Sequence, residues 1–141
     1  MAHPIHPMIV HFPIAAWSLA TLADIVSLSI GGVAGDFAGM ALLIGVVTAF
    51  LAMLAGLPEL EKIKKGSLAM STAKWHILLI TLAASLYVIS LLLRIKEMTL
   101  QPPGILAAGF SLSGFIFLCI AGWMGAQLVY QYGVGVEKSD E

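Results

Sequence analysis

Histidines gather at the beginning of this chain, in a segment where prolines alternate with them. Three of the four histidines, His3, His6 and His11, lie within the first thirteen residues, together with three prolines. Imidazole is a common metal ligand and the side chain that changes its charge near neutral pH. Because the residue before a proline is driven towards extended geometry, we expect His3 and His6 on an extended arm and His11 about one turn inside a helix. The segment therefore predicts a site for a metal or for a metal-containing cofactor.

The composition predicts a membrane protein. Of the 141 residues, 60% are hydrophobic and 11% are charged, whereas a soluble domain has about 45–50% and about 25%. Such a chain lacks the polar side chains to cover a water-soluble globule, so we expect lipid as its solvent. The net charge of -1 gives no electrostatic support for a nucleic-acid partner. The single cysteine, Cys119, can form no intramolecular disulfide.

Four apolar stretches approach or exceed the roughly 20 residues that a transmembrane helix needs, at about 8–30, 37–57, 72–93 and 105–130. The sequence thus predicts one domain over residues 1–141, an all-α integral membrane four-helix bundle. We expect the second stretch to end before Pro58. No basic segment precedes the first stretch and no small-residue cleavage site follows it promptly, so we interpret it as a retained span. We find no convincing internal repeat between the two helix pairs.

Positive charges predict how the bundle is oriented. With four spans, both termini lie on one side, together with the loop between the second and third spans. That side carries five cations, and the other side carries Arg94 and Lys96. The five are Lys62, Lys64, Lys65, Lys74 and Lys138. By the positive-inside rule we expect both termini in the cytoplasm.

The fourth histidine, His76, lies about one turn inside the third span. Odd-numbered helices run in the same direction, so His11 and His76 enter the membrane from the same face, each about 4–6 Å along its helix. Two imidazoles on facing helices can ligate both axial positions of a haem iron. The chain has no Cys-x-x-Cys-His motif for covalent attachment, so this bis-histidine hypothesis predicts haem b between His11 and His76. In this hypothesis His6 is either an alternate haem ligand or a residue that contacts one of the two ligands.

Aromatic and amide residues at the same membrane face complete the predicted haem site. The fourth helix returns to that face near its end, and one tryptophan directly precedes His76. The residues expected to shape the site are Trp75, Gln127 and Tyr130.

Two other interpretations stay open. His3, His6 and His11, with or without His76, could bind a divalent transition metal, since zinc and copper accept imidazole readily. The histidines could instead bond backbone carbonyls or headgroups in a cofactor-free assembly subunit. Small residues at four-residue spacing favour close helix packing inside the bundle, with a homodimer as the alternative; the pairs are Gly45 and Ala49, Ala52 and Gly56, and Ala121 and Gly125. The chain shows no nucleophile, base and orienting group in a hydrolase pattern, so we favour an electron carrier over an enzyme.

Asp24 needs a partner, because it lies well inside the first span, about 20 Å along the helix from His11. A carboxylate at such depth usually faces the bundle interior or a cavity. Thirteen residues rotate Asp24 about 140° from His11, whereas Trp17, seven residues earlier, shares its face. We expect a structural partner such as Arg94, Tyr87 or Thr48, and keep one step of a proton path as the alternative.

Motifs at the two ends of the chain carry a resemblance to a known family. They are His3-Pro-x-His-Pro-x-x-Val-His-Phe-Pro13 and Gly122-Trp-x-Gly-x-x-Leu-Val-Tyr-x-x-Gly-Val-Gly135. With Asp24 and His76 they resemble the bacterial four-helix membrane proteins catalogued as domain of unknown function 2231, over essentially the whole chain.

The resemblance implies membrane redox traffic, because some relatives are fused to Rieske-type iron–sulfur or cytochrome c domains. It supports haem and implies electron exchange with a quinone or a redox protein at the bacterial inner membrane. The chain has Ala126-Gln127 where relatives have Gly-Gly, and some relatives place a histidine near position 127.

Overall fold

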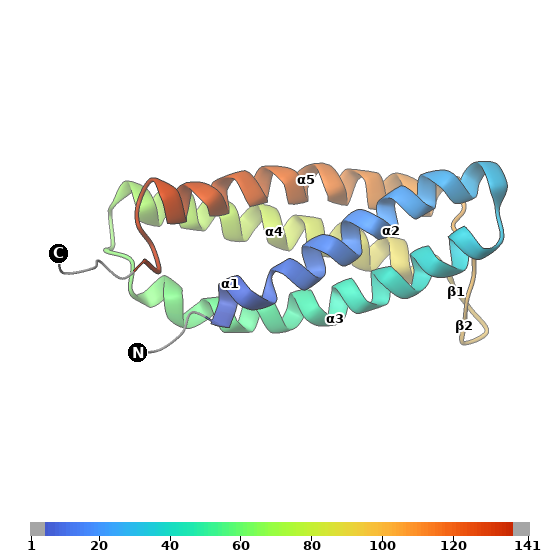
Figure 1. Cartoon of the computed structure of the whole chain (residues 1–141), viewed down its shortest axis with the longest axis horizontal. Helices are drawn as coiled ribbons and strands as arrows, with labels where there is room; N and C mark the ends of the chain where they lie inside the picture. Colours follow the sequence, from blue (N-terminus) through green and yellow to red (C-terminus); the bar gives the residue numbers. More distant parts are fainter. Residues whose placement is uncertain (1–4, 137–141) are drawn as a thin grey trace.

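The computed structural model describes residues 5–136 and shows long helices packed side by side in one bundle (Figure 1). The helices are α1 Ile5–Ile9, α2 His11–Ile30, α3 Val33–Glu61, α4 Leu68–Leu92 and α5 Ile105–Tyr130, with a short hairpin of β1 Ile95–Lys96 and β2 Thr99–Leu100. Four helical segments are long and apolar enough to cross a membrane: Ile5–Ile30, Val33–Glu61, Leu68–Leu92 and Ile105–Tyr130. The predicted all-α four-helix membrane bundle is confirmed.

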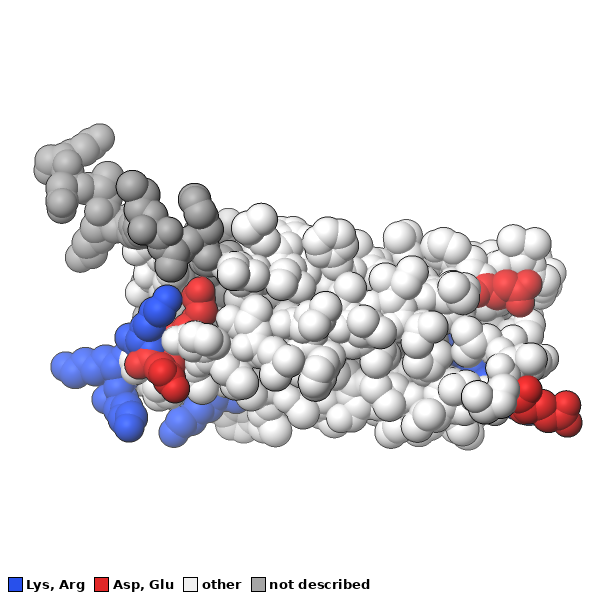
Figure 2. All heavy atoms as spheres, turned by 90° about the horizontal axis from the view of Figure 1, so that it is seen from below, with Lys and Arg blue, Asp and Glu red and all other residues white. Residues whose placement is uncertain are grey.

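Apolar side chains cover the outside of the bundle. Leucine, isoleucine, valine and phenylalanine side chains are exposed along all four spans, while the buried core consists largely of alanines around Trp17, Leu42, Tyr87 and Leu118. Figure 2 shows charged side chains at the two ends of the visible face and none across its middle. Lipid is the solvent in which this arrangement is stable, because the helices satisfy their own backbone hydrogen bonds and present apolar surface.

The bundle consists of two helical hairpins. α2 packs most extensively on α3, and α4 on α5, and both hairpins are visible in Figure 1. Gly31 and Gly32 take positive φ angles of 62° and 59° in the turn between α2 and α3, a conformation that costs glycine little. The β1–β2 hairpin begins the connection from α4 to α5, and its central residues Glu97 and Met98 have φ angles of 48° and 60°, as in a type I′ turn.

Three helix ends differ by four residues from the predicted spans, and one of them is the start of α3, at Val33 rather than near residue 37. α3 continues through Pro58 to Glu61, beyond the predicted end at residue 57, because a proline removes a single N–H from the helix and the turns around it remain bonded. α4 begins at Leu68 rather than near residue 72, because the Ser67 hydroxyl caps it by accepting the Met70 N–H at 3.2 Å. Such a cap satisfies one of the free donors of the first turn.

Candidate functional site

His6 is held against α3 by a hydrogen bond to the backbone. Its Nδ1 donates to the carbonyl oxygen of Ala52 at 2.8 Å, and its ring lies beside Gly56, where an added Cβ would sit 3.0 Å from Nδ1. A carbonyl oxygen only accepts, so Nδ1 carries a proton and Nε2 of the neutral ring keeps its lone pair. His6 lies on helix α1, so the extended arm predicted for it is wrong; Pro7 is the third residue of that helix, where a proline is tolerated.

His76 repeats this arrangement on the other hairpin. Its Nδ1 donates to the carbonyl oxygen of Ala121 at 2.8 Å, and an added Cβ on Gly125 would lie 3.2 Å from its Cε1. Both histidines lie near the same end of the bundle, where α1 and α4 begin (Figure 1). Metal-ligating histidines are usually held in this way, with one ring nitrogen anchored and the other left to bind.

The structure anchors His6 and His76 to backbone carbonyls. His11, the predicted partner of His76, is exposed on α2, because it is turned by about 140° from the buried face that carries Asp24. His3 lies outside the described residues.

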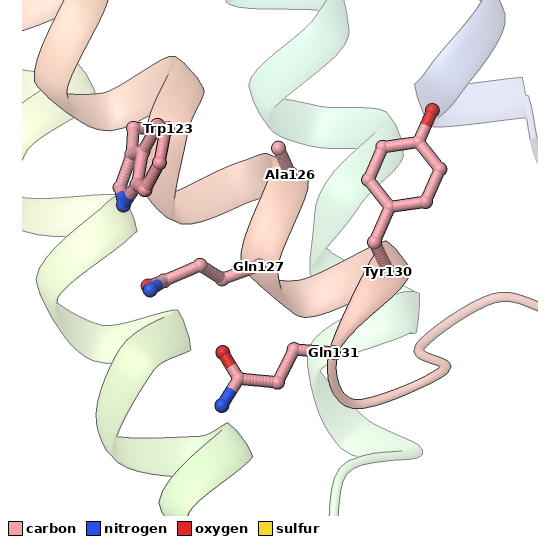
Figure 3. Close-up of a pocket in the computed structure, with 5 residues that line it drawn as sticks. All are labelled: Trp123, Ala126, Gln127, Tyr130 and Gln131. Carbon is pink, nitrogen blue, oxygen red and sulfur yellow. The ribbon is translucent and has the colours of Figure 1, made fainter.

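The aromatic and amide residues expected around the site lie on the outside of the bundle. The Trp75 and Tyr130 side chains are 55% and 88% exposed. Gln127 is half-buried, and Figure 3 shows it along one helix with the other residues that line a shallow depression of about 500 Å³: Trp123, Ala126, Tyr130 and Gln131. Tyr130 is nine residues beyond the buried Ala121, about 180° around the helix.

At the opposite end of the bundle, Asp24 and Arg94 form a buried ion pair. Arg94 Nη1 and Nη2 donate to Asp24 Oδ1 and Oδ2 at 2.7 and 2.5 Å, and neither side chain is exposed. Nη2 also donates to the Ser90 and Ser111 hydroxyls at 3.0 and 3.3 Å. Ser90 in turn donates to the Ala107 carbonyl at 2.7 Å. The prediction of Arg94 as the partner of Asp24 is confirmed.

Between the histidines and the ion pair, two aromatic rings fill the middle of the bundle. Trp17 and Tyr87 stack with their ring centroids 4.5 Å apart and their planes 15° apart. The Thr21 hydroxyl bonds the Tyr87 hydroxyl at 2.9 Å and donates to the Trp17 carbonyl at 2.9 Å. Among residues 5–136, Trp17 Nε1 is the one buried side-chain nitrogen or oxygen without a hydrogen-bond partner. Tyr87 thus bonds Thr21 rather than Asp24, and Thr48 bonds the Ile44 carbonyl of its own helix.

The hydroxyls of Thr21, Ser90 and Ser111 were not singled out by the sequence analysis. A signal for one of them exists, because Ser90 precedes Arg94 by four residues. Residues three or four apart share a helix face. Polar residues at these spacings from a charge inside a span are therefore candidates for its hydrogen-bond partners.

The fold and these buried contacts define a multi-pass helical membrane protein whose four spanning helices enclose polar side chains. The sequence matches the family described as "Predicted membrane protein (DUF2231)" over residues 2–138. The chain belongs to this family, which confirms the resemblance. No curated protein and no solved structure matches the chain.

Proposed function

We propose that the protein is a membrane b-type cytochrome whose axial haem ligands are Nε2 of His6 and Nε2 of His76. The observation that carries the proposal is the pair of imidazoles, each anchored through Nδ1 to a carbonyl of the neighbouring helix at 2.8 Å. Anchoring fixes the tautomer and the ring orientation and raises the basicity of the ligating nitrogen. His6 takes the role predicted for His11, because His11 is exposed on the outer surface of α2.

The number of available ligands favours a haem over a bare metal ion. Within residues 5–136, no group of three or more histidine, cysteine, aspartate or glutamate side chains is placed to hold a metal. A structural zinc ion takes four protein ligands, whereas a haem brings four equatorial nitrogens and needs two axial ligands from the protein. A site with two anchored imidazoles meets the second requirement.

The chain's own residues bind the cofactor and set its surroundings. Gly56 and Gly125 make room for the two imidazoles, because an added Cβ would lie 3.0 Å from His6 Nδ1 and 3.2 Å from His76 Cε1. A haem iron supplies one-electron redox chemistry, and burial together with the hydrogen bonds to the two imidazoles tunes its potential. We propose electron exchange with a membrane quinone or a redox protein as the role of this site, because the chain shows no residue set for hydrolysis.

We further propose that the histidine end faces the cytoplasm across a bacterial inner membrane. Figure 2 shows basic side chains gathered at one end of the bundle; the loop after α3 carries Lys62, Lys64 and Lys65, and α4 carries Lys74 near its start. At the other end Arg94 is neutralised by Asp24 inside the bundle, which leaves Lys96 as the exposed cation of its connection. The imbalance favours this orientation. Two variants with a single cysteine, at position 64 or at position 96 in a Cys119→Ser background, test this orientation. A membrane-impermeant maleimide added to intact spheroplasts should label the cysteine at position 96 and not the one at position 64.

A visible difference spectrum tests the haem. The protein is expressed with full haem supply, purified in detergent, and measured after dithionite reduction against the air-oxidised sample. We expect sharp reduced α and Soret bands that disappear in His6→Ala and in His76→Ala. His11→Ala is the matched control and should keep the bands. Imidazole added to His6→Gly or His76→Gly should restore them, which separates loss of a ligand from loss of the fold.

Two results would overturn the assignment. A colourless, folded protein excludes the haem, and metal analysis of the same sample then decides whether the divalent-metal interpretation replaces it. Bands that survive in His6→Ala and disappear in His11→Ala would return the ligand role to His11.

A further inference from the structure

Two pairs of residues that contact one another across the bundle, and a pair of histidines at one of its ends, are separated by the same number of positions in the chain. Arg94 and Asp24, which form the ion pair, are 70 residues apart. Tyr87 and Trp17, which stack, are also 70 residues apart. His6 and His76 share this separation, since 76 − 6 = 70. The first residue of each pair belongs to the first hairpin and the second residue to the second hairpin.

The contacts inside each hairpin correspond in the same way. Trp17 lies against Gly45, and Tyr87 lies against Gly114. His6 bonds the carbonyl of Ala52 and His76 that of Ala121, and their rings lie beside Gly56 and Gly125. The residues on the second helices are all 69 positions apart: 114 − 45, 121 − 52 and 125 − 56. The two hairpins therefore use equivalent positions for equivalent contacts.

Burial follows the same shifts. The six buried positions of α5 fall, after a shift of 69, on buried positions of α3: Ala107, Ala108, Ser111, Gly114, Leu118 and Ala121 correspond to Ala38, Gly39, Leu42, Gly45, Ala49 and Ala52. Four buried positions of α4 fall, after a shift of 70, on buried positions of α2: Ala83, Tyr87, Ser90 and Leu91 correspond to Pro13, Trp17, Ala20 and Thr21. The two hairpins thus present the same inner face.

We propose that the bundle is an internal repeat of one helical hairpin around a two-fold axis along the bundle, and that the Asp24–Arg94 pair makes only unlike halves fit together. Parallel repeats related by an axis along the membrane normal are one way in which multi-helix membrane proteins are built. The two contacting pairs, Asp24–Arg94 and Trp17–Tyr87, join equivalent positions and so lie across this axis. The inference stands on these contacts alone and does not depend on a cofactor. The sequence analysis found no convincing internal repeat between the two helix pairs, and the proposal revises that interpretation.

The ion pair gives the two halves their specificity. If two first hairpins paired, Asp24 would face a second Asp24, and if two second hairpins paired, Arg94 would face a second Arg94. Like charges buried together at an interface are strongly unfavourable. The stacked rings and the histidines tolerate either pairing, since each side contributes the same kind of group. The charge pair therefore determines that the inner face of each hairpin binds the other hairpin and not a copy of itself.

The hydroxyls around the ion pair make the repeat testable, because only one half carries them. Ser90 and Ser111, which accept hydrogen bonds from Arg94, correspond to Ala20 and Leu42 of the first hairpin. Exchanging the three pairs of equivalent residues should rebuild the same network on the other side of the axis. The exchange variant of the full chain carries Asp24→Arg, Arg94→Asp, Ala20→Ser, Ser90→Ala, Leu42→Ser and Ser111→Leu.

The experiment compares the folded-to-unfolded ratio of full-length variants in detergent. Asp24→Arg and Arg94→Asp alone, which place like charges on the axis, should each lower this ratio by about a hundredfold or more. The exchange variant should recover most of the loss and elute as a monomer. A second exchange variant carries only the four substitutions at positions 20, 24, 90 and 94. It controls for a mismatch in side-chain volume at positions 42 and 111. Recovery in either exchange variant supports the repeat, and failure of both to exceed the single variants overturns it.

Discussion

Replacing Gly45 by alanine should destabilise the bundle more than its small size suggests. An added Cβ at this position would lie closer than 3.0 Å to two atoms of the Trp17 indole, Cδ1 and Nε1. The indole is fully buried and stacked on Tyr87 at 4.5 Å, so it has no free space into which to move. The methyl group must therefore push α3 away from α2 or break the aromatic stack.

The magnitude follows from three terms. Overpacking a close-packed core costs about 1–3 kcal/mol, and the overlap with a fixed aromatic ring puts Gly45→Ala near the upper end. Disturbing the stack of Trp17 on Tyr87 adds about 1 kcal/mol. Alanine regains about 1 kcal/mol of helix propensity over glycine. The net loss is about 3 kcal/mol, a factor of about a hundred in the folded-to-unfolded ratio.

Equilibrium unfolding in mixed micelles, followed by tryptophan fluorescence, measures this loss. Gly109→Ala is the matched control, because Gly109 is exposed on α5 and has no atom within 4 Å of an added Cβ. Trp17→Phe shortens the ring that the new methyl group meets. It should therefore lower the free energy of unfolding less in the Gly45→Ala background than in the wild-type background. The reasoning is refuted if Gly45→Ala is as stable as Gly109→Ala, or if Trp17→Phe costs the same in both backgrounds.

Three further substitutions give expected outcomes in the same unfolding assay. Tyr87→Phe removes the hydroxyl that Thr21 bonds at 2.9 Å and should cost about 1 kcal/mol; a loss above about 3 kcal/mol would reveal a further partner of that hydroxyl. Ser67→Ala removes the cap of α4 and should cost about 1 kcal/mol, which Ser67→Asp should largely restore. Pro58→Ala restores a missing N–H inside α3 and should stabilise the protein by up to about 3 kcal/mol; destabilisation would show that the bundle needs the proline's geometry.

The spans and the partner of Asp24 could be predicted from the sequence because each depends on a single strong physical requirement. A bilayer demands long apolar helices, and these are visible without any knowledge of packing. A carboxylate inside the membrane demands a partner, and few cations lie within reach of it. Arg94, at the far end of the third span, was one of them.

The backbone geometry of His6 was mispredicted for a different reason. Eighteen residues separate His6 from Asp24, which is five full turns of a helix, so His6 shares the buried face of Asp24. The same geometry already turned His11 away from that face. The sequence analysis missed the correspondence because the prolines around His6 were taken to hold it in an extended segment. Pro7 instead occupies the first turn of α1, where no hydrogen bond is lost.

The repeat was hidden for a chemical reason. Its two visible traces, Ala52 with Gly56 and Ala121 with Gly125, were recognised only as small residues that let helices approach. The two halves differ at the ion pair, because an aspartate must meet an arginine and not another aspartate. Selection for unlike partners thus removes from the sequence the identity by which a repeat is usually detected.

The stack of Trp17 on Tyr87 also decides what can move through the middle of this protein. Both rings are fully buried, and they meet between the histidine end and the ion pair, so two flat apolar surfaces fill the middle of the bundle there. A route for an ion or a hydrated solute along this axis would require the two rings, and with them the two hairpins, to separate.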